Sequence, residues 1–408
     1  MTTTPTLDDL RNACQHATAI RRVARMQPAG GVGDKVFPPT YEGGEYADEE
    51  RVIDGARVPC VLLDSVQSQA NRMEACLLEA HCAKEIAIPV ITVDFAAVDL
   101  AEVGTITSLD APHRLADAIL RDSTLDGKKF RDSEPGKVLD TASNANATGL
   151  FGVCPTALVF GVWDSAGPRG GLGVKFARAL VGEIVGVDAE KGKRPSSRID
   201  PLGIRADAGP AYEAQDGWTL DESKARRDKG KPVLVGKDGK PSELNHGNVT
   251  PSLRNEKKQL HHGGVTFRYA RHSAVLSLAA LRRLHFPVDG APGDAKARDL
   301  AARTVLAALG LTAIALAAER GADLRSRCTL ALEAGTAAPF EVVRGDGTVS
   351  AFTLSAADAE RLLGEAVATA RALGLPWHAE GYTAVPRPEF AELVRRSRKL
   401  AMKSGAEE

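Results

Sequence analysis

The order of the elements that the sequence predicts constrains the fold more than any other feature. Strand, helix, strand and helix are followed by further strands and then by helices, which favours an α+β domain of the ferredoxin-like type with large insertions over a doubly wound sheet. Hydrophobic periodicity predicts strands at 57–63, 86–98, 155–163 and 175–186, and helices at 6–19, 63–77, 108–122, 299–319, 355–373 and 388–403.

One long segment, residues 186–260, cannot bury much core by itself. It is rich in Lys, Asp, Gly, Pro and Ser and carries few large apolar side chains. Its charges are roughly balanced, which is typical of a flexible reaching loop rather than a basic tail. The whole chain of 408 residues is 43% hydrophobic and 26% charged, the balance of a soluble globular protein.

The net charge of -1 argues against a protein that coats nucleic acid by bulk charge, but it leaves room for a basic groove on one face. Six cysteines lack a CxxC pair, and the chain shows no secretory leader, so we expect reduced thiols in the cytoplasm. The apolar run at 304–318 is shorter than the ~20 residues of a membrane span and predicts a buried helix without membrane contact.

The helix at 63–77 has an unusual polar face. Asp64 or Ser65 can cap it, and Val66, Met73 and Leu77 supply an apolar face. The opposite face offers hydrogen-bond donors beside the free N–H groups of the first turn, a combination suited to phosphate or ribose oxygens. Buried polar packing explains the same pattern. The residues of this face are Gln67, Ser68, Asn71 and Arg72.

A second helix start is predicted at 108–122, with Asp110 as cap and Pro112 in the first turn. His113 and Arg114 are again suited to bind an anion there, and a solvated helix end is the alternative. The glycine-rich stretch GPRGGLGVKFARAL has no complete phosphate-loop or dinucleotide fingerprint. It remains a candidate turn against a polyanion, and Trp163 beside it is expected in the core. Further basic candidates are Arg169, Lys175, Arg254, Lys257, Lys258 and His261.

No metal, cofactor or catalytic constellation is predicted. Cys76, His81 and Cys82 lie close in sequence, but their spacing fits no common zinc pattern. Paired carboxylates in a glycine-rich cleft and a Ser/His/Asp order are also missing from the sequence. The basic helix at 388–403 has one apolar side, so it either docks on a neighbouring subunit or is simply solvated.

Seven motifs in order carry a resemblance to a known family. They are PAGGVGDKVFPPTY, LDSVQSQANRMEACL, APHRLADAILRDS, PTALVFGVWDS, SSRIDPLGI, LAALRRLHFP and LRSRCTL. In these motifs the chain resembles the CRISPR-associated RAMP protein of type I-U systems, also called I-G, from about Leu7 to Leu332. The C-terminal quarter is the weakest part of the likeness.

The resemblance implies a modified RNA-recognition-motif palm with large finger and thumb insertions, over residues 1–204 and 261–408, and a flexible thumb-like insertion over 205–260. Gly30 to Tyr46 is a second thumb candidate. It implies the repeated backbone subunit of a Cascade surveillance complex, without catalysis. Its expected partners are CRISPR RNA, the target DNA strand paired to the guide, other copies of itself and other Cascade subunits.

The resemblance also implies guide contacts. Ser68, Asn71 and Arg72 take this role from the SVQSQANR motif, and His113 and Arg114 take it from APHR, with Arg72 expected to contribute most. The alternative function is an endoribonuclease that processes the precursor RNA, with His113, His261 or His262 as acid-base groups. A small-molecule enzyme built on the glycine-rich loop is a weaker third.

Overall fold

The computed structural model describes residues 4–165, 173–253, 262–291 and 294–404. By its internal contacts the chain divides into two units. The first comprises Met1–Tyr41, Tyr46–Ala189 and Phe267–Glu392, and the second comprises Glu42–Glu45, Glu190–Thr266 and Leu393–Glu408. The predicted division into a palm and a 205–260 insertion stays a prediction.

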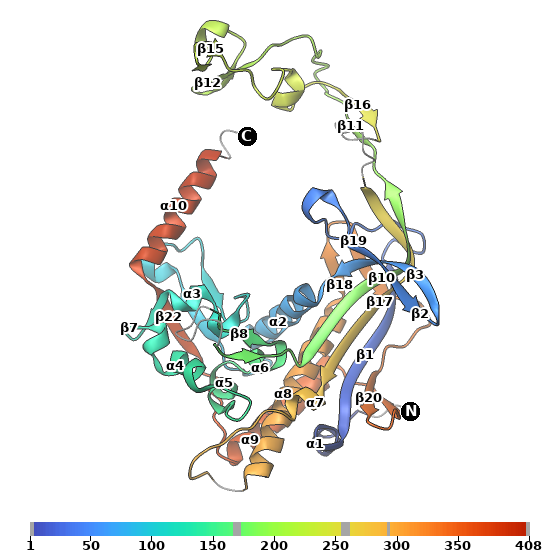
Figure 1. Ribbon diagram of the computed structural model, residues 1–408, viewed down its shortest axis with the longest axis vertical. Coiled ribbons are helices and arrows are strands. Elements are labelled where there is room, and N and C mark those ends of the chain that lie inside the picture. Colours follow the sequence, from blue (N-terminus) through green and yellow to red (C-terminus); the bar gives the residue numbers. More distant parts are fainter. Residues whose placement is uncertain (1–3, 166–172, 254–261, 292–293, 405–408) are drawn as a thin grey trace. The chain divides into compact units, whose positions relative to one another are not determined.

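The first unit is organised around a large sheet (Figure 1). Its strands lie in the order β18 (Ala322–Arg325), β19 (Cys328–Leu332), β1 (Ala17–Pro28), β17 (His262–Ser277), β10 (Leu180–Lys193), β3 (Ala56–Asp64) and β2 (Asp48–Ile53). β20 (Phe340–Arg344) also pairs with β1, and β21 (Val349–Phe352) pairs with β20. β1 runs antiparallel to β17, in a register that sets Arg22 opposite Ala274.

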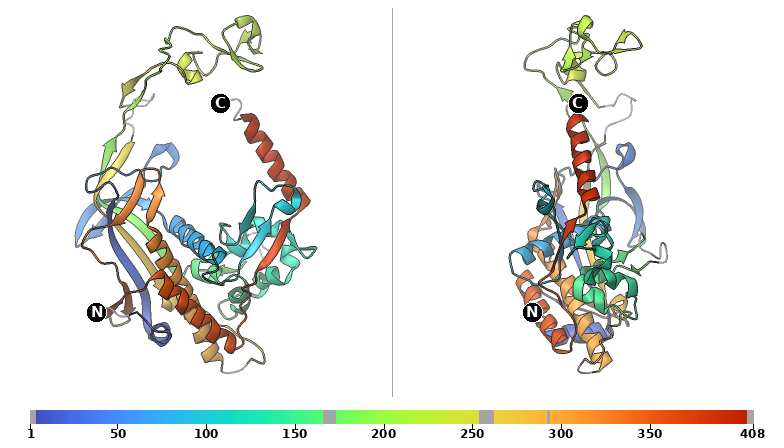
Figure 2. Two further views of the ribbon diagram at one scale, coloured as in Figure 1. Left: turned by 180° about the vertical axis from the view of Figure 1, so that it is seen from behind. Right: turned by 90° about the vertical axis from the view of Figure 1, so that its left-hand side faces the viewer.

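Helices cover one face of this sheet. They are α1 (Leu7–His16), α2 (Val66–Cys82), the short α7 (Leu278–Leu281), α8 (Ala295–Arg320) and α9 (Ala356–Ala372). Figures 1 and 2 show α8 running along the sheet with α9 against it. Glycine permits the close approach of helix and strand, because a Cβ at Gly182 would lie 2.9 Å from the Met73 methyl of α2. A Cβ at Gly310 of α8 would lie 3.1 Å from Leu276.

Six of these elements follow one another as strand, helix, strand, strand, helix and strand. They are β1, α2, β10, β17, α8 and β19, and their four strands lie side by side in the order β19-β1-β17-β10. The β2–β3 hairpin is inserted between β1 and α2 and extends the sheet beyond β10. The combination of helices and a sheet in this arrangement confirms the predicted α+β class.

A smaller sheet is built mainly from the chain between α2 and β10. Its order is β5 (Thr105–Thr107), β4 (Ile91–Asp94), β22 (Tyr382–Pro386), β6 (Ser123–Leu125) and β7 (Lys128–Lys129), with β22 parallel to β4. Around it lie α3 (Ala118–Arg121), α4 (Glu134–Thr141), α5 (Thr148–Val153), α6 (Thr156–Phe160) and the pair β8 (Val162–Trp163) and β9 (Lys175–Phe176). Phe95 packs edge-on against Phe390 near the start of α10 (Pro388–Ser404), at 5.7 Å between centroids.

The second unit includes three short strand pairs among its described residues. These are β11 (Ser196–Arg198) with β16 (Val249–Ser252), β12 (Tyr212–Ala214) with β13 (Gly217–Thr219), and β14 (Arg227–Asp228) with β15 (Lys231–Pro232). Polar contacts organise its turns: the Asp200 carboxylate accepts the backbone N–H groups of Leu202, Ile204 and Gly247. Among the described residues of the two units, 3-10 turns lie at Glu42–Gly44, Ala96–Val98, Arg114–Ala116, Phe130–Asp132, Glu222–Lys224 and Pro241–Leu244.

Several predicted elements are confirmed. The helices expected at 6–19 and 63–77 are α1, which begins with a capping box of Thr6 and Asp9, and α2, which Ser65 caps. The three helices expected after residue 298 are α8, α9 and α10. The apolar run at 304–318 lies in α8, which is long and apolar enough to cross a membrane. The most apolar 18 residues of this helix are, however, 78% buried inside the protein. This burial is typical of a core helix.

Two predicted elements are wrong. Residues 155–163 form the buried helix α6 and the two-residue strand β8 instead of one long strand, because a short apolar run has no periodicity that separates the two. Residues 108–122 form turns and the four-residue α3 instead of one helix. Asp110 accepts the N–H of Thr107, and Asp117 caps α3.

Candidate nucleic-acid interface

The first two turns of α2 present the polar face that the sequence predicts. The Ser65 hydroxyl accepts the N–H of Ser68 at 3.2 Å, which defines the start of the helix. Gln67 and Asn71 are exposed, and Ser68 is half-buried. The side chains of Ala70 and Met73 are buried on the other side. The structure therefore leaves the amide groups of Gln67 and Asn71 accessible beside the positive end of a 17-residue helix.

A buried carboxylate lies directly before this helix. Asp64 is 0% exposed, and its Oδ2 accepts hydrogen bonds from Gln69 Nε2 at 2.6 Å and Arg72 Nε at 3.0 Å. Arg325 of β18 approaches the other oxygen at 3.5 Å. Two guanidinium groups thus face one carboxylate, and the cluster carries one excess positive charge.

Arg72 holds α2 to the sheet. Besides Asp64, its guanidinium donates to the backbone carbonyls of Asp323 at 3.0 Å and Leu324 at 2.5 Å in β18. These contacts engage Nε and both terminal nitrogens, and they give Arg72 a structural role. The prediction that Arg72 contributes most to RNA binding stays a prediction.

Arg114 lies inside the protein, in the 3-10 turn before α3. Its Nε and Nη2 donate to the two oxygens of Glu74 in α2, each at 2.6 Å, and Nη1 donates to the carbonyl of Gly161 at 2.8 Å. The Arg114 side chain is 7% exposed and that of Glu74 2%. Burial raises the pKa of Glu74 to about 7, and the Arg114 guanidinium opposes that shift.

The predicted anion site at 113–114 therefore lacks both of its supports. Arg114 is occupied by Glu74, and α3 with four residues is too short to supply a strong helix end. His113 is exposed, and its backbone N–H donates to Asp117 at 3.0 Å. Its predicted RNA contact remains untested.

An exposed aromatic residue was missed by sequence reasoning. Trp163 is 51% exposed, which corrects the expectation that it lies in the core. The ammonium group of Lys175, on the partner strand β9, lies 5.2 Å from the centre of its ring. The pairing of a tryptophan with a lysine across two strands could not be read from residues twelve positions apart.

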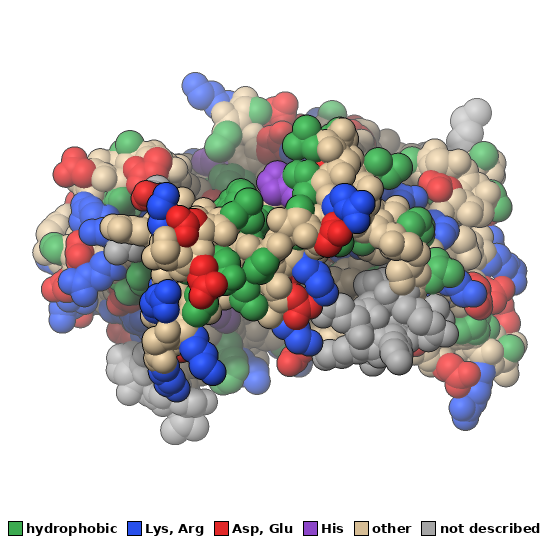
Figure 3. Space-filling view, turned by 90° about the horizontal axis from the view of Figure 1, so that it is seen from above, with side chains coloured by type: hydrophobic (Ala, Val, Ile, Leu, Met, Phe, Trp, Pro, Cys, Tyr) green, Lys and Arg blue, Asp and Glu red, His purple; other side chains and the backbone are tan. Residues whose placement is uncertain are grey.

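The other predicted contacts lie outside the described residues. These are Arg169, Arg254, Lys257, Lys258 and His261. Within the described residues, no group of three or more His, Cys, Asp or Glu side chains could hold a metal ion. On the face drawn in Figure 3, Lys and Arg side chains are interspersed with Asp and Glu side chains.

Comparison with known families finds a match over part of the chain. Residues 20–191, which include most of β1, β3, α2, strands β4 to β7 of the smaller sheet and most of β10, match the model of the family described as CRISPR-associated protein GSU0053. No curated protein matches the chain at a significant level. The family match supports a CRISPR-associated protein and suggests a role in CRISPR defence.

Proposed function

We propose that the chain is the repeated backbone subunit of a type I-U (I-G) Cascade complex, binding CRISPR RNA along its phosphate-sugar backbone and oligomerising on it. The observation that carries this proposal is the family match over residues 20–191. The strand order β19-β1-β17-β10, with α2 and α8 as crossover helices, supports an RNA-recognition-motif-like palm. In this role the protein is cytoplasmic and not an enzyme.

The exposed face of α2 is the proposed guide-binding surface. Gln67 and Asn71 offer neutral donors at the positive end of the helix, and the cluster of Asp64, Arg72 and Arg325 adds one net positive charge. Donors of this kind suit phosphate and 2′-hydroxyl oxygens, which every nucleotide presents. Binding at this face would therefore tolerate any guide sequence.

Trp163 and Lys175 form a second element of the proposed surface. An exposed aromatic ring beside a cation is the combination that single-stranded nucleic acids use for stacking and phosphate contact. The segment at 205–260 is the proposed thumb, reaching towards the next copy. Target DNA paired to the guide and other Cascade subunits complete the proposed assembly.

The decisive experiment adds negative charge to the α2 face. In the double variant Gln67→Glu/Asn71→Glu both changes fall on exposed positions, so folding should be unaffected. A matched control, Ala357→Glu/Ala368→Glu, adds the same charge on exposed positions of α9. Gel mobility shifts with a single-stranded guide RNA at about 50 mM and about 200 mM salt would report binding.

We expect the α2 variant to bind the guide at least about tenfold more weakly, a loss of about 1.4 kcal/mol, while the control binds as the unmodified protein does. Light scattering should show oligomers that lengthen with the RNA. Equal affinity of both variants would remove α2 from the interface. A protein that never shifts RNA at low salt would refute the function, and cleavage of repeat RNA would favour the processing endoribonuclease.

A further inference from the structure

A cavity of about 450 Å³ lies inside the first unit, between α2, the end of α8 and strands β18 and β19. Its lining includes the apolar residues Met26, Ile184 and Leu332. The lining also contains three guanidinium groups and an imidazole, from Arg22, Arg72, Arg320 and His272. This volume lies within the range of small-molecule sites in proteins.

Arg22 is a buried cation without a counter-charge in the part of the chain that the structure describes. It points to the helix-covered face of β1, is 8% exposed, and makes no hydrogen bond or ion pair through its side chain with any described residue. Burial lowers the pKa of Arg22, and no carboxylate offsets this effect. Since burying an unpaired charge is expensive, a fold that keeps one has a reason to do so.

His272 lies beside it on the neighbouring strand. The register pairs Arg22 with Ala274 and Ala24 with His272, so the two side chains are diagonal neighbours on the same face. His272 is 8% exposed, and its Nε2 is buried with no hydrogen-bond partner. Burial and the nearby Arg22 lower the pKa of His272 to about 4, so the ring is neutral at neutral pH.

The other charged groups of the cavity already have partners. Arg72 pairs with Asp64, and Arg320 pairs with Glu79. The Asp323 carboxylate accepts the hydroxyl of Thr329 at 2.9 Å. Only the Arg22 guanidinium and the His272 Nε2 thus combine deep burial with a missing partner among the charged lining residues described.

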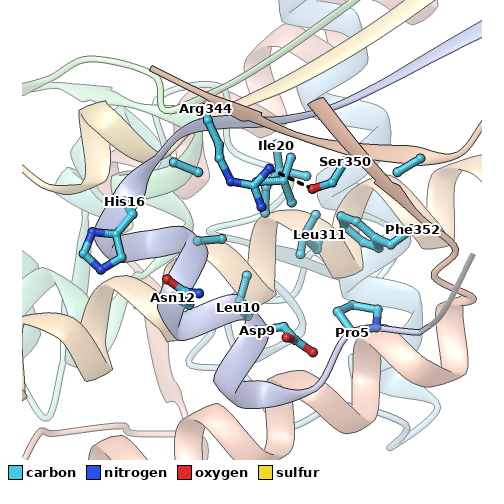
Figure 4. A pocket seen from close by; sticks show the side chains of 14 residues that line it. Pro5, Asp9, Leu10, Asn12, His16, Ile20, Leu311, Arg344, Ser350 and Phe352 are labelled. Atoms are coloured by element: carbon cyan, nitrogen blue, oxygen red, sulfur yellow. Dashed lines mark hydrogen bonds between the residues drawn. The ribbon is translucent and has the colours of Figure 1, made fainter. Parts of the chain in front are cut away.

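Two neighbouring hollows show the contrast. In the cavity between α1, α8 and β20–β21, of about 260 Å³, Arg344 donates to Ser350 at 3.2 Å (Figure 4). Asp9 of the same lining accepts the backbone N–H of Thr6. Arg22 also lines a hollow of about 460 Å³ beside β20. The one carboxylate in that lining, Glu319, accepts the backbone N–H of Ala356.

We propose that the cavity between α2, α8 and β18–β19 binds the phosphate group of a nucleotide, with Arg22 and His272 as its donors. The guanidinium presents two parallel N–H groups to phosphate oxygens, and the neutral imidazole can donate from Nε2. The apolar lining residues then pack against the base or sugar. This inference goes beyond guide binding at the α2 face, because the cavity is a separate site. Its phosphate group can come from a free nucleotide or from a nucleotide of RNA, since both present the same chemistry.

Thermal unfolding of the full chain tests the proposal. The probes are inorganic phosphate, adenosine 5′-monophosphate, adenosine, acetate and a short single-stranded RNA. The variants are Arg22→Met, Arg22→Lys and the matched control Arg344→Met in the cavity of Figure 4. A ligand that binds only the folded state raises the midpoint as its concentration rises.

We expect phosphate and the monophosphate to raise the midpoint of the unmodified protein and of Arg344→Met. Arg22→Met should lose this rise and Arg22→Lys should keep part of it. Circular dichroism would verify that Arg22→Met is folded. It should also melt higher than the unmodified protein without ligand, since it removes an unpaired buried charge. A lower melting point would mean that Arg22 is structural.

The different probes distinguish the source of the phosphate group from the question whether the cavity binds phosphate at all. A rise with the monophosphate indicates a free nucleotide, whereas an Arg22-dependent rise with RNA alone indicates a nucleotide of RNA. An equal rise with acetate or adenosine would overturn the phosphate assignment, and so would no rise with any probe or an unchanged response of Arg22→Met. If the monophosphate binds through Arg22 and RNA never does, the pocket stands and the guide-binding function fails.

Discussion

Replacing Arg114 by Met should destabilise the protein strongly. The change removes both hydrogen bonds to Glu74 and leaves a carboxylate that is 2% exposed without its cation. Breaking a buried ion pair from one side costs about 3–5 kcal/mol, mostly through the uncompensated charge. Urea unfolding of Arg114→Met and of the double variant Glu74→Gln/Arg114→Met would measure this cost. The double variant should recover most of the loss, because no unpaired charge is then buried.

The loss should depend on pH in a defined direction. Burial already raises the pKa of Glu74 to about 7, and removing Arg114 removes a group that lowers it. The pKa of Glu74 in the unfolded chain is near 4.5, so the folded variant holds the proton on Glu74 more tightly than the unfolded chain does. Its stability is therefore greatest below that value and falls as pH rises through the folded pKa, by up to about 1.4 kcal/mol per pH unit.

We therefore expect a larger deficit at about pH 8 than at about pH 5. Arg121→Met is the matched control, since Arg121 is 44% exposed and pairs with Asp122 at the surface. Its cost should stay within about 1 kcal/mol. A deficit of Arg114→Met as small as that of the control, or one that grows towards acid, would refute the reasoning and return Arg114 to the candidates for RNA contact.

Three further predictions concern single side chains. Arg72→Ala should lower the free energy of unfolding, measured in urea, by about 2–3 kcal/mol, because Asp64 and two carbonyls of β18 lose a charged donor. An unchanged free energy of unfolding would show that these hydrogen bonds do not stabilise the protein. The neutral His272 contributes stability that is present above its unfolded pKa of 6.5 and is lost as pH falls towards about 4. In His272→Gln the free energy of unfolding should therefore change less over this pH range, by up to about 3 kcal/mol. Parallel pH profiles of the variant and the unmodified protein would contradict the burial effect. Iodoacetamide should label Cys82 first by mass spectrometry, because the other five thiols are buried and burial raises the pKa of Cys14 to about 12; faster labelling elsewhere would indicate local opening.

Local signals in the sequence were sufficient for the longest helices, α1, α2, α8, α9 and α10. The capping box of Thr6 and Asp9 and the start of α2 near Ser65 depend on residues within one turn of each other. The late helices follow from periodicity over many residues. Sequence reasoning also placed Gln67 and Asn71 on an open polar face, since helical spacing alone decides which side of α2 they occupy.

Local signals failed where the surroundings decide the outcome. Residues 155–163 are almost wholly apolar, and only the packing around them selects a buried helical turn over a strand. The predicted helix at 108–122 gave way to turns, with Asp110 accepting the Thr107 N–H and Asp117 capping α3. Asp and Asn side chains readily form such local bonds, which compete with a helix start.

The sequence by itself determined the α+β class, the main helices and the polar face of α2, because these follow from spacing and capping along the chain. Only the tertiary structure decided what the charged side chains do. Arg114 meets a carboxylate forty residues away, and Arg72 reaches carbonyls about 250 residues away. Arg22 and His272 become neighbours through strand pairing, and neither the Arg22 guanidinium nor the His272 Nε2 has a hydrogen-bond partner among the described residues. A charge acts through its distance to other charges in space, and that distance is set when the sheet and its helices come together.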